Sequence, residues 1–355
     1  MLLKRILTAA ALAVLLALCA HCCAETFLIT SDLHLTEDRA AHTAVLDALR
    51  RAAGSADAVI LLGDSTNNAH PGEHALVLEF LLSLEKPAYV IPGNHDITAD
   101  ISDFIDLYAG HGWDRAFSRD ADTASCAVLT EGGTCLLLMD TCSGPGYAAP
   151  MGGISDAACA WAAETLAALP AGTPVVACGH HPILPAERDA RTPGAGRLAE
   201  ALRGVKLYLC GHDHGFAAVK AGGLQQITVG QPHAFPGWAG MLEVTGERLS
   251  WRVLPLYDAE THRAMREDAA ALAEGMARGT LEGTIHEGDE DAIRWFVEAF
   301  VLAMTSRLDE EVCEEMLREP AAQKWREITT KTVVKKWILG LLENRPQDVR
   351  RIELH

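Results

Sequence analysis

Five short blocks of polar residues between Asp32 and His214 constrain the fold of this chain more than any other feature. Each block follows an apolar run of strand length and carries side chains that bind metal ions. The blocks are Asp32-Leu33-His34, Gly63-Asp64, Gly93-Asn94-His95-Asp96, Gly179-His180-His181 and Gly211-His212-Asp213-His214. In open α/β sheets, ligands bind at the carboxyl edge of the strands, where loops converge on one crevice. We therefore expect the five blocks to lie together at such an edge.

The spacing between the blocks supports this arrangement. Asp32, Asp64 and Asn94 are separated by 32 and 30 residues, and His180 lies 32 residues before His212. Each separation is close to the length of one strand–helix–strand unit, about 30 residues. The blocks are therefore expected to be neighbours in space.

Candidate ligands alternate within two of the blocks. Asp32 and His34, and likewise His212 and His214, are two residues apart, so in an extended chain each pair points to one face. The blocks supply seven candidate oxygen or imidazole ligands: Asp32, His34, Asp64, Asn94, His180, His212 and His214. One tetrahedral ion needs only four ligands, so the set favours two divalent metal ions that share a carboxylate.

The hydrophobic pattern from Thr26 to about Leu256 predicts a layered α/β architecture, because short apolar runs alternate with amphipathic stretches. The apolar runs 27–30, 59–62 and 88–91 show no polar alternation, so we expect parallel strands buried on both faces. A hairpin over 125–139 and short strands up to Val253 complete two facing mixed sheets flanked by helices. The fold expected is a four-layer α/β/β/α sandwich.

The last hundred residues have a different pattern. Apolar residues at helical spacing from Ile293 to Met304, and again from Val333 to Leu341, predict amphipathic helices. We found no strand pattern after Val253. Residues 258–355 are therefore expected to form an all-helical appendage that serves as a surface for self-association or a partner, or as a stabilising cap.

The first 24 residues have the features of a secretory signal peptide. Lys4 and Arg5 precede an uncharged run, Ile6–Ala20, which is shorter than the roughly 20 residues needed to span a bilayer. Small residues follow, and Ala24 suits cleavage before Glu25. We expect an exported mature chain, secreted, periplasmic or at the cell surface, with no transmembrane span.

Two alternatives for the leader are weaker. An uncleaved anchoring helix is disfavoured because strand-like residues begin almost immediately, at Thr26. A lipid anchor at Cys19 is disfavoured because Leu18 is bulky where such sites carry a small residue. Free secretion and lipid anchoring are not separated further by the sequence.

Charge and cysteine content exclude several functions. The formal net charge of −18 becomes −20 when Lys4 and Arg5 leave with the leader, which disfavours nucleic acid and anionic lipid as partners. An anionic substrate therefore needs a local source of positive charge. Seven cysteines remain after the leader, in apolar stretches and without a CxxC pair, so we expect buried thiols and no thiolate metal site, with a single incidental disulfide as the alternative.

In their order, the five blocks resemble the pattern of the calcineurin-like metallophosphoesterase superfamily: DxH, GD, GNHD, a later His, and GHxH. The resemblance runs from Asp32 to His214 and continues to about Val253, so residues 25–257 are expected to be the catalytic domain. It implies that one ion is held by Asp32, His34, Asp64 and His214. The other is held by Asp64, Asn94, His180 and His212, so Asp64 bridges the pair.

The resemblance also implies the chemistry. Two divalent ions such as Mn, Fe or Zn clamp a phosphate and lower the pKa of a bridging water. His95 matches the histidine that contacts the phosphate and protonates the leaving oxygen. The expected function is exported hydrolysis of small phosphomonoesters or phosphodiesters. The alternatives are a catalytically silent metal-binding surface scaffold, against which the intact His95 argues, and a nuclease of the same fold, disfavoured by acidity and export.

Departures from the sequence pattern of the family narrow the range of expected substrates. Asp64 is followed by Ser-Thr-Asn-Asn, without the arginine that protein Ser/Thr phosphatases use against phosphate. No tyrosine stands where purple acid phosphatases place an iron-binding phenolate, and the helical tail differs from the substrate domain of 5′-nucleotidases. Small phosphomonoesters, cyclic nucleotides and other phosphodiesters remain as substrates.

The neighbours of the ligands have less defined roles. The His-x-Pro pattern that ends at Pro182 favours His180 as the ligand, so His181 either contacts substrate or packs. Asp96 and Asp213 are expected to be supporting or surface carboxylates. Of the other histidines, we place only His233 near the rim of the site.

Overall fold

The computed structural model describes residues 24–97, 100–142, 151–184, 192–329, 333–344 and 346–355. Its first sheet has six strands, which in spatial order are β13 (Arg351–Leu354), β12 (Arg248–Pro255), β11 (Trp238–Thr245), β1 (Glu25–Thr30), β2 (Ala58–Leu61) and β3 (Ala88–Val90). Strands β1, β2 and β3 are parallel, as predicted from their unbroken apolar runs, whereas β11, β12 and β13 are antiparallel.

The second sheet has seven strands. In spatial order they are β4 (Ser118–Arg119), β5 (Cys126–Leu129), β6 (Cys135–Met139), β7 (Val175–Gly179), β8 (Leu207–Cys210), β10 (Leu224–Thr228) and β9 (Ala217–Ala221). The predicted hairpin is confirmed, because β5 and β6 pair antiparallel. Strands β6, β7, β8 and β10 are parallel, so both sheets present carboxyl ends of parallel strands to loops.

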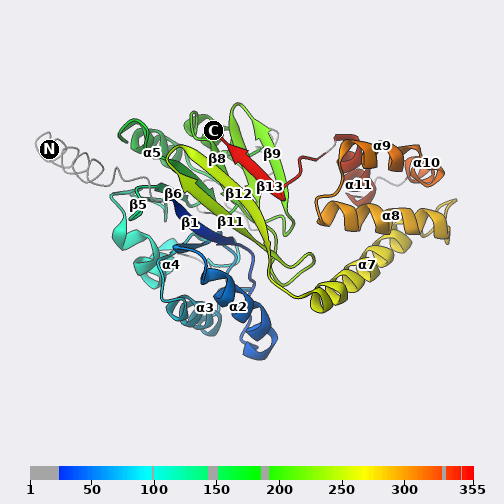
Figure 1. Cartoon of the computed structure of the whole chain (residues 1–355), viewed down its shortest axis with the longest axis horizontal. Coiled ribbons are helices and arrows are strands. Elements are labelled where there is room, and N and C mark those ends of the chain that lie inside the picture. Colours follow the sequence, from blue (N-terminus) through cyan, green and yellow to red (C-terminus); the bar gives the residue numbers. More distant parts are fainter. Residues whose placement is uncertain (1–23, 98–99, 143–150, 185–191, 330–332, 345) are drawn as a thin grey trace, which may run out of the picture.

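Helices cover the outer face of each sheet (Figure 1). Those that pack on the first sheet are α2 (Arg39–Ala53), α3 (Pro71–Ser83) and α4 (Ile101–Tyr108), followed by the short 3₁₀ turns η1 (Ala109–His111) and η2 (Trp113–Arg115). Those on the second sheet are α5 (Asp156–Ala167) and α6 (Ala195–Ala201). Side chains such as Phe27, Ile60, Leu138 and Leu209 form the core between the sheets. The predicted four-layer α/β/β/α sandwich is confirmed.

Five further helices form the appendage, on one side of the sandwich (Figure 1). They are α7 (Ala259–Leu281), α8 (Glu290–Met304), α9 (Glu310–Arg318), α10 (Pro320–Glu327) and α11 (Val333–Asn344). They share a core of their own, in which Phe296 stacks on Trp325 with ring centroids 4.9 Å apart. None of the helices in the described part of the chain is long and apolar enough to cross a membrane.

The chain returns to the first sheet after α11, and here the sequence prediction is wrong. We expected no strand after Val253, but β13 pairs antiparallel with β12, with Leu354 opposite Leu249. The return is anchored by Trp251, whose buried indole Nε1 donates to the Val349 carbonyl at 2.9 Å. A four-residue strand is too short for its alternation to be recognised in sequence.

The prediction of buried thiols is confirmed. All seven cysteines beyond the leader are free and buried: Cys126, Cys135, Cys142, Cys159, Cys178, Cys210 and Cys313. Burial raises the pKa of the Cys135 thiol to about 12, so it stays protonated and behaves as a small apolar side chain.

Candidate metal centre

The seven candidate ligands lie in loops that follow β1, β2, β3, β7 and β8. Five of them have left-handed backbone conformations, with φ of 54° at Asp32, 43° at His34, 50° at Asp64, 72° at His212 and 57° at His214. This region is disfavoured for residues other than glycine, and such strain concentrates at functional sites. The loops are therefore held in place by their surroundings.

Backbone hydrogen bonds tie these loops together. The Asp32 amide donates to the Gly63 carbonyl at 3.0 Å and the His34 amide to the Asp64 carbonyl at 2.9 Å, which joins the β1 and β2 loops. Both carboxylate oxygens of Asp32 accept the His212 amide at 3.1 Å, which joins the first sheet to the second. The five blocks meet at one edge, as their spacing predicts.

The first group consists of Asp32, His34, Asp64 and His214, whose ligand atoms all lie within 4.8 Å of one another. The Nε2 atoms of His34 and His214 are 3.1 Å apart, and Asp64 Oδ2 is 3.7 Å from the His34 Nε2. Both carboxylates are buried, while the side chain of His214 is 48% exposed. These are the four residues that the resemblance assigns to one ion, and the group opens to solvent on the side of His214.

The second group lies on the other side of Asp64. His180 Nε2 is 3.2 Å from Asp64 Oδ2, and His212 Nδ1 is 3.2 Å from Asn94 Oδ1. The structure thus brings together the four residues assigned to the second ion, with the Asp64 carboxylate between the groups. Occupancy by metal stays a prediction.

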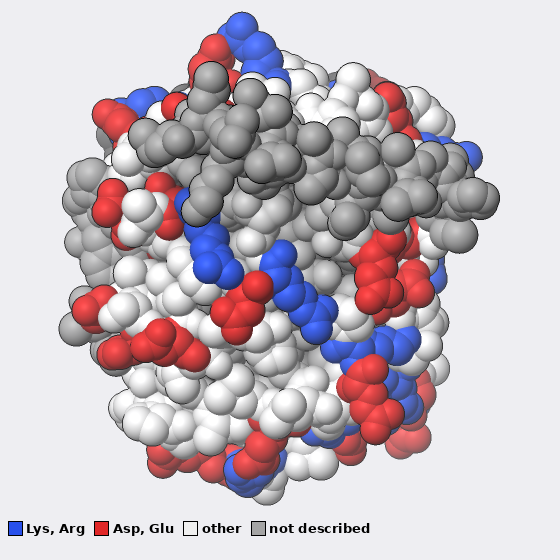
Figure 2. Space-filling view, turned by 90° about the vertical axis from the view of Figure 1, so that its left-hand side faces the viewer, with Lys and Arg blue, Asp and Glu red and all other residues white. Residues whose placement is uncertain are grey.

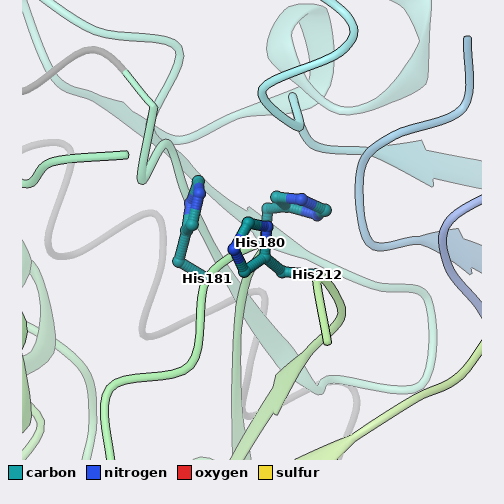
Figure 3. Close-up of side chains that lie close together, drawn as sticks. All are labelled: His180, His181 and His212. Carbon is teal, nitrogen blue, oxygen red and sulfur yellow. The ribbon is translucent and has the colours of Figure 1, made fainter. Parts of the chain in front are cut away.

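His181 joins His180 and His212 in a cluster of three imidazoles (Figure 3). Its ring lies 4.3 Å from that of His212, but it is fully buried and its Nδ1 is 2.9 Å from the Thr141 hydroxyl. The same hydroxyl accepts the His181 amide at 3.0 Å. The sequence leaves two roles open for His181, substrate contact and packing. The structure supports packing behind the site. Thr141 carries no motif and could not have been selected from the sequence.

One buried nitrogen shows that a cation fits these residues. The Nδ1 atom of His180 bonds to the Leu62 carbonyl at 2.8 Å, which turns Nε2 toward Asp64. That Nε2 is buried and faces Asp64 Oδ2 at 3.2 Å, in an ion-pair contact and not in a hydrogen bond of good geometry. A metal ion held by His180 and Asp64 would be a partner for both groups.

The electrostatics of the histidines agree with this role. Burial lowers the pKa of His34 and of His212 to about 4, so both rings are neutral at pH 7 and their lone pairs are available to a metal. Burial also disfavours the charged form of His180, but the negative charge of Asp64 outweighs it and raises the pKa to about 9. In the absence of metal, the proton of His180 compensates the carboxylate that an ion would neutralise.

The two buried aspartates differ. Burial raises the pKa of Asp32 to about 7. Burial acts in the same direction on Asp64, but the positive charge of His180 and their close contact hold its pKa well below the usual range. Asp64 is therefore the anionic centre of the cluster.

His95 lies beside the ligands without belonging to either group. Its amide donates to Asp64 Oδ1 at 2.8 Å, and its ring stands edge-on to His34 with centroids 4.7 Å apart. Its Nδ1 is 2.6 Å from the Asn67 carbonyl, so that nitrogen carries the proton and Nε2 points elsewhere. A ring fixed in this way can present Nε2 to a substrate.

Asp96 fixes the backbone of the site through hydrogen bonds. It is buried and accepts hydrogen bonds from the amides of Gly93 at 2.9 Å, Ser65 at 3.2 Å and Thr66 at 2.8 Å. These contacts fix the loops that carry Asp64 and Asn94. Of the roles considered for Asp96, the supporting one is confirmed.

Comparison with known proteins agrees with this geometry. The sequence profile of the calcineurin-like phosphoesterases matches residues 25–216, more than half of the chain. The chain belongs to that family. None of the curated protein sequences compared with it matches.

Several solved structures are similar to part of this chain. A purple acid phosphatase from yellow lupin (Lupinus luteus) seeds has 13% identity and a TM-score of 0.47, covering 66% of this chain and 52% of its own. The GAP50 anchor of the inner membrane complex of Plasmodium has 12% identity and a TM-score of 0.45, over 66% and 86%. Vacuolar protein sorting 29 from Cryptosporidium parvum has 14% identity and a TM-score of 0.35, over 66% and 93%. This chain spans about half the length of the lupin phosphatase.

A substitution at Gly93 tests whether the position of Asp64 controls metal binding. A Cβ atom at this position would lie 2.1 Å from both the Asp64 amide nitrogen and its Oδ1, so Gly93→Ala must displace the carboxylate. We expect this variant to lose most of its bound metal and about 1–3 kcal/mol of unfolding free energy. Elemental analysis and denaturant titration measure the two effects.

The matched control is Gly110→Ala in η1, where a Cβ atom would meet nothing within 4 Å. It should retain the parent metal content and stability. A Gly93→Ala variant that keeps its full metal load would contradict the assigned role of Asp64.

Proposed function

We propose that this chain is an exported hydrolase of small phosphomonoesters or phosphodiesters that works with two divalent metal ions. The observation that carries the proposal is the placement of Asp64 between two groups of ligands, next to the buried Nε2 of His180. Membership of the calcineurin-like phosphoesterase family supports the reaction class.

The residues of the proposed site have two roles: seven are metal ligands and one is a proton donor. Asp32, His34, Asp64 and His214 would hold one ion, and Asp64, Asn94, His180 and His212 the other. Bound divalent ions supply positive charge for the phosphate and lower the pKa of water. This local charge is what an acidic chain needs to accept an anionic substrate.

His95 is proposed to protonate the leaving oxygen. The Asn67 carbonyl accepts its Nδ1 proton and fixes the ring, while the Asp64 carboxylate fixes its backbone amide. Nε2 is then the atom that donates. The donated proton prevents the leaving group from departing as a costly alkoxide.

The charge of the chain argues against a polyanionic substrate. Polyanions bind to proteins through clustered lysine and arginine side chains. The formal charge of −18 therefore disfavours the nuclease alternative. On the one face drawn in Figure 2, the described acidic and basic side chains are interspersed.

Substitution of His95 separates an enzyme from a silent scaffold. If His95 donates a proton, His95→Ala should retain both ions but lower kcat by about 10² to 10⁴-fold for an alkyl phosphate, which has a poor leaving group. An aryl phosphate leaves as a stable anion, so its kcat should fall much less. Steady-state kinetics on both esters, with metal content measured in parallel, give the answer.

His95→Asn is the control for positioning, because its amide can still bond to the Asn67 carbonyl but cannot donate an acidic proton. It should behave like His95→Ala on the alkyl ester. Equal losses on both ester types would show that His95 only positions the phosphate. A metal-loaded parent that hydrolyses no phosphoester would favour the scaffold.

Export is proposed from the leader, which lies outside the described residues apart from Ala24. The fold is compatible with cleavage there, because β1 begins at Glu25 and the Glu25 side chain accepts a hydrogen bond from the Thr130 hydroxyl at 2.7 Å. N-terminal sequencing of native protein should therefore begin at Glu25. Recovery of the intact leader on protein from the cytoplasm would refute the proposal.

A further inference from the structure

A small cleft lies where the sandwich meets the appendage. Its volume is about 250 Å³, and its walls include His233 and Phe235 from the loop after β10 and Met265, Leu272, Phe300 and Met304 from α7 and α8. Leu272 is 62% exposed there, whereas Phe235 and Phe300 are buried. One carboxylate, Asp268, also lines it. The walls are otherwise apolar apart from His233.

The loop that forms one wall is connected to the metal centre. The Gln231 amide donates to the carbonyl of the candidate ligand His214 at 3.3 Å, and Gly230 packs on the same carbonyl. Four residues after Gln231, the loop packs against the appendage, where the ring centroids of Phe235 and of His262 in α7 are 5.4 Å apart. The cleft and the first ligand group therefore share one short loop.

His233 stands on this loop, is exposed and lines the cleft. The side chain of the candidate ligand His214 is 48% exposed. The first ligand group and the wall of the cleft that carries His233 are therefore both open to solvent, and the Gln231 hydrogen bond joins them.

We propose that this cleft binds a short hydrocarbon portion of the phosphoester that the metal centre hydrolyses, so that the substrates are amphiphilic phosphoesters. The inference rests on the proposed function, since it names the substrate class for the same site. At about 250 Å³ the cleft is smaller than the 300–1,000 Å³ typical of whole-ligand pockets, so it takes part of a ligand. Met265 and Met304 are flexible and polarizable and adapt to chains of different shape.

A binding measurement tests the inference without turnover. The metal-loaded protein is titrated calorimetrically with n-alkylphosphonates from methyl to octyl, which carry the phosphate-like group but have no ester bond to hydrolyse. The association constant should rise about fourfold for each of the first methylenes buried and then level off when the cleft is full. An affinity independent of chain length would overturn the inference.

Two variants locate the effect. Leu272→Asp, at an exposed position of α7, places a charge in the cleft and should flatten the dependence on chain length. Leu82→Asp, on α3 and 75% exposed outside the cleft, should keep the parent dependence. An unchanged dependence in Leu272→Asp would overturn the assignment. A second result would also overturn the assignment: the parent protein is a dimer, and Leu272→Asp dissociates this dimer without altering the affinity for phosphonates. The cleft would then bind a second copy of the chain.

Hydrolysis of methyl and phenyl phosphate, measured separately, distinguishes failure of the proposed function from failure of this inference. If both esters are hydrolysed but the affinity for phosphonates does not depend on chain length, the proposed function is supported and the assignment of the cleft is wrong. If neither is hydrolysed, the proposed function fails, and the assignment of the cleft to its substrate fails with it.

Discussion

The structure depends on one buried carboxylate, that of Asp64. Its Oδ1 accepts the His95 amide at 2.8 Å, while its Oδ2 lies 3.2 Å from the His180 Nε2 and 3.7 Å from the His34 Nε2. Loops after four different elements thus converge on two oxygen atoms. A buried carboxylate is costly unless it is compensated. Here the compensation comes from His180 in the absence of metal, and would come from cations when they bind.

The sandwich makes this convergence possible. Parallel strands end at one edge of each sheet, and left-handed residues in the loops after β1, β2 and β8 carry five of the seven candidate ligands. Glycines at the turns permit close backbone approach: a Cβ on Gly211 would lie 1.9 Å from the Ser31 hydroxyl and 2.6 Å from Asp32 Oδ2. The strain of these turns is balanced by hydrogen bonds such as those of Asp96.

The sequence predicted the parts of the structure that depend on local pattern. Unbroken apolar runs predicted the parallel strands β1 to β3, and strand-end motifs predicted which residues meet. It did not predict β13, because four residues carry too little alternation. Nor did it predict where α7, α9 and α10 lie within the helical appendage, because these helices are less apolar than α8 and α11. The packing role of His181 depends on Thr141, which lies 40 residues away and is recognisable only in three dimensions. Likewise, the cleft beside His233 exists only because the appendage folds back onto a loop.

The central claim is that Asp64 joins two metal ions, and anomalous X-ray scattering from crystals of the manganese- or zinc-loaded chain tests it most directly. The account predicts two anomalous peaks about 3.5 to 4 Å apart, each within coordination distance of one oxygen of Asp64. One peak should also contact His34 and His214, and the other His180 and His212. A single peak under metal-replete conditions, or two peaks of which one lies away from Asp64, would contradict the account.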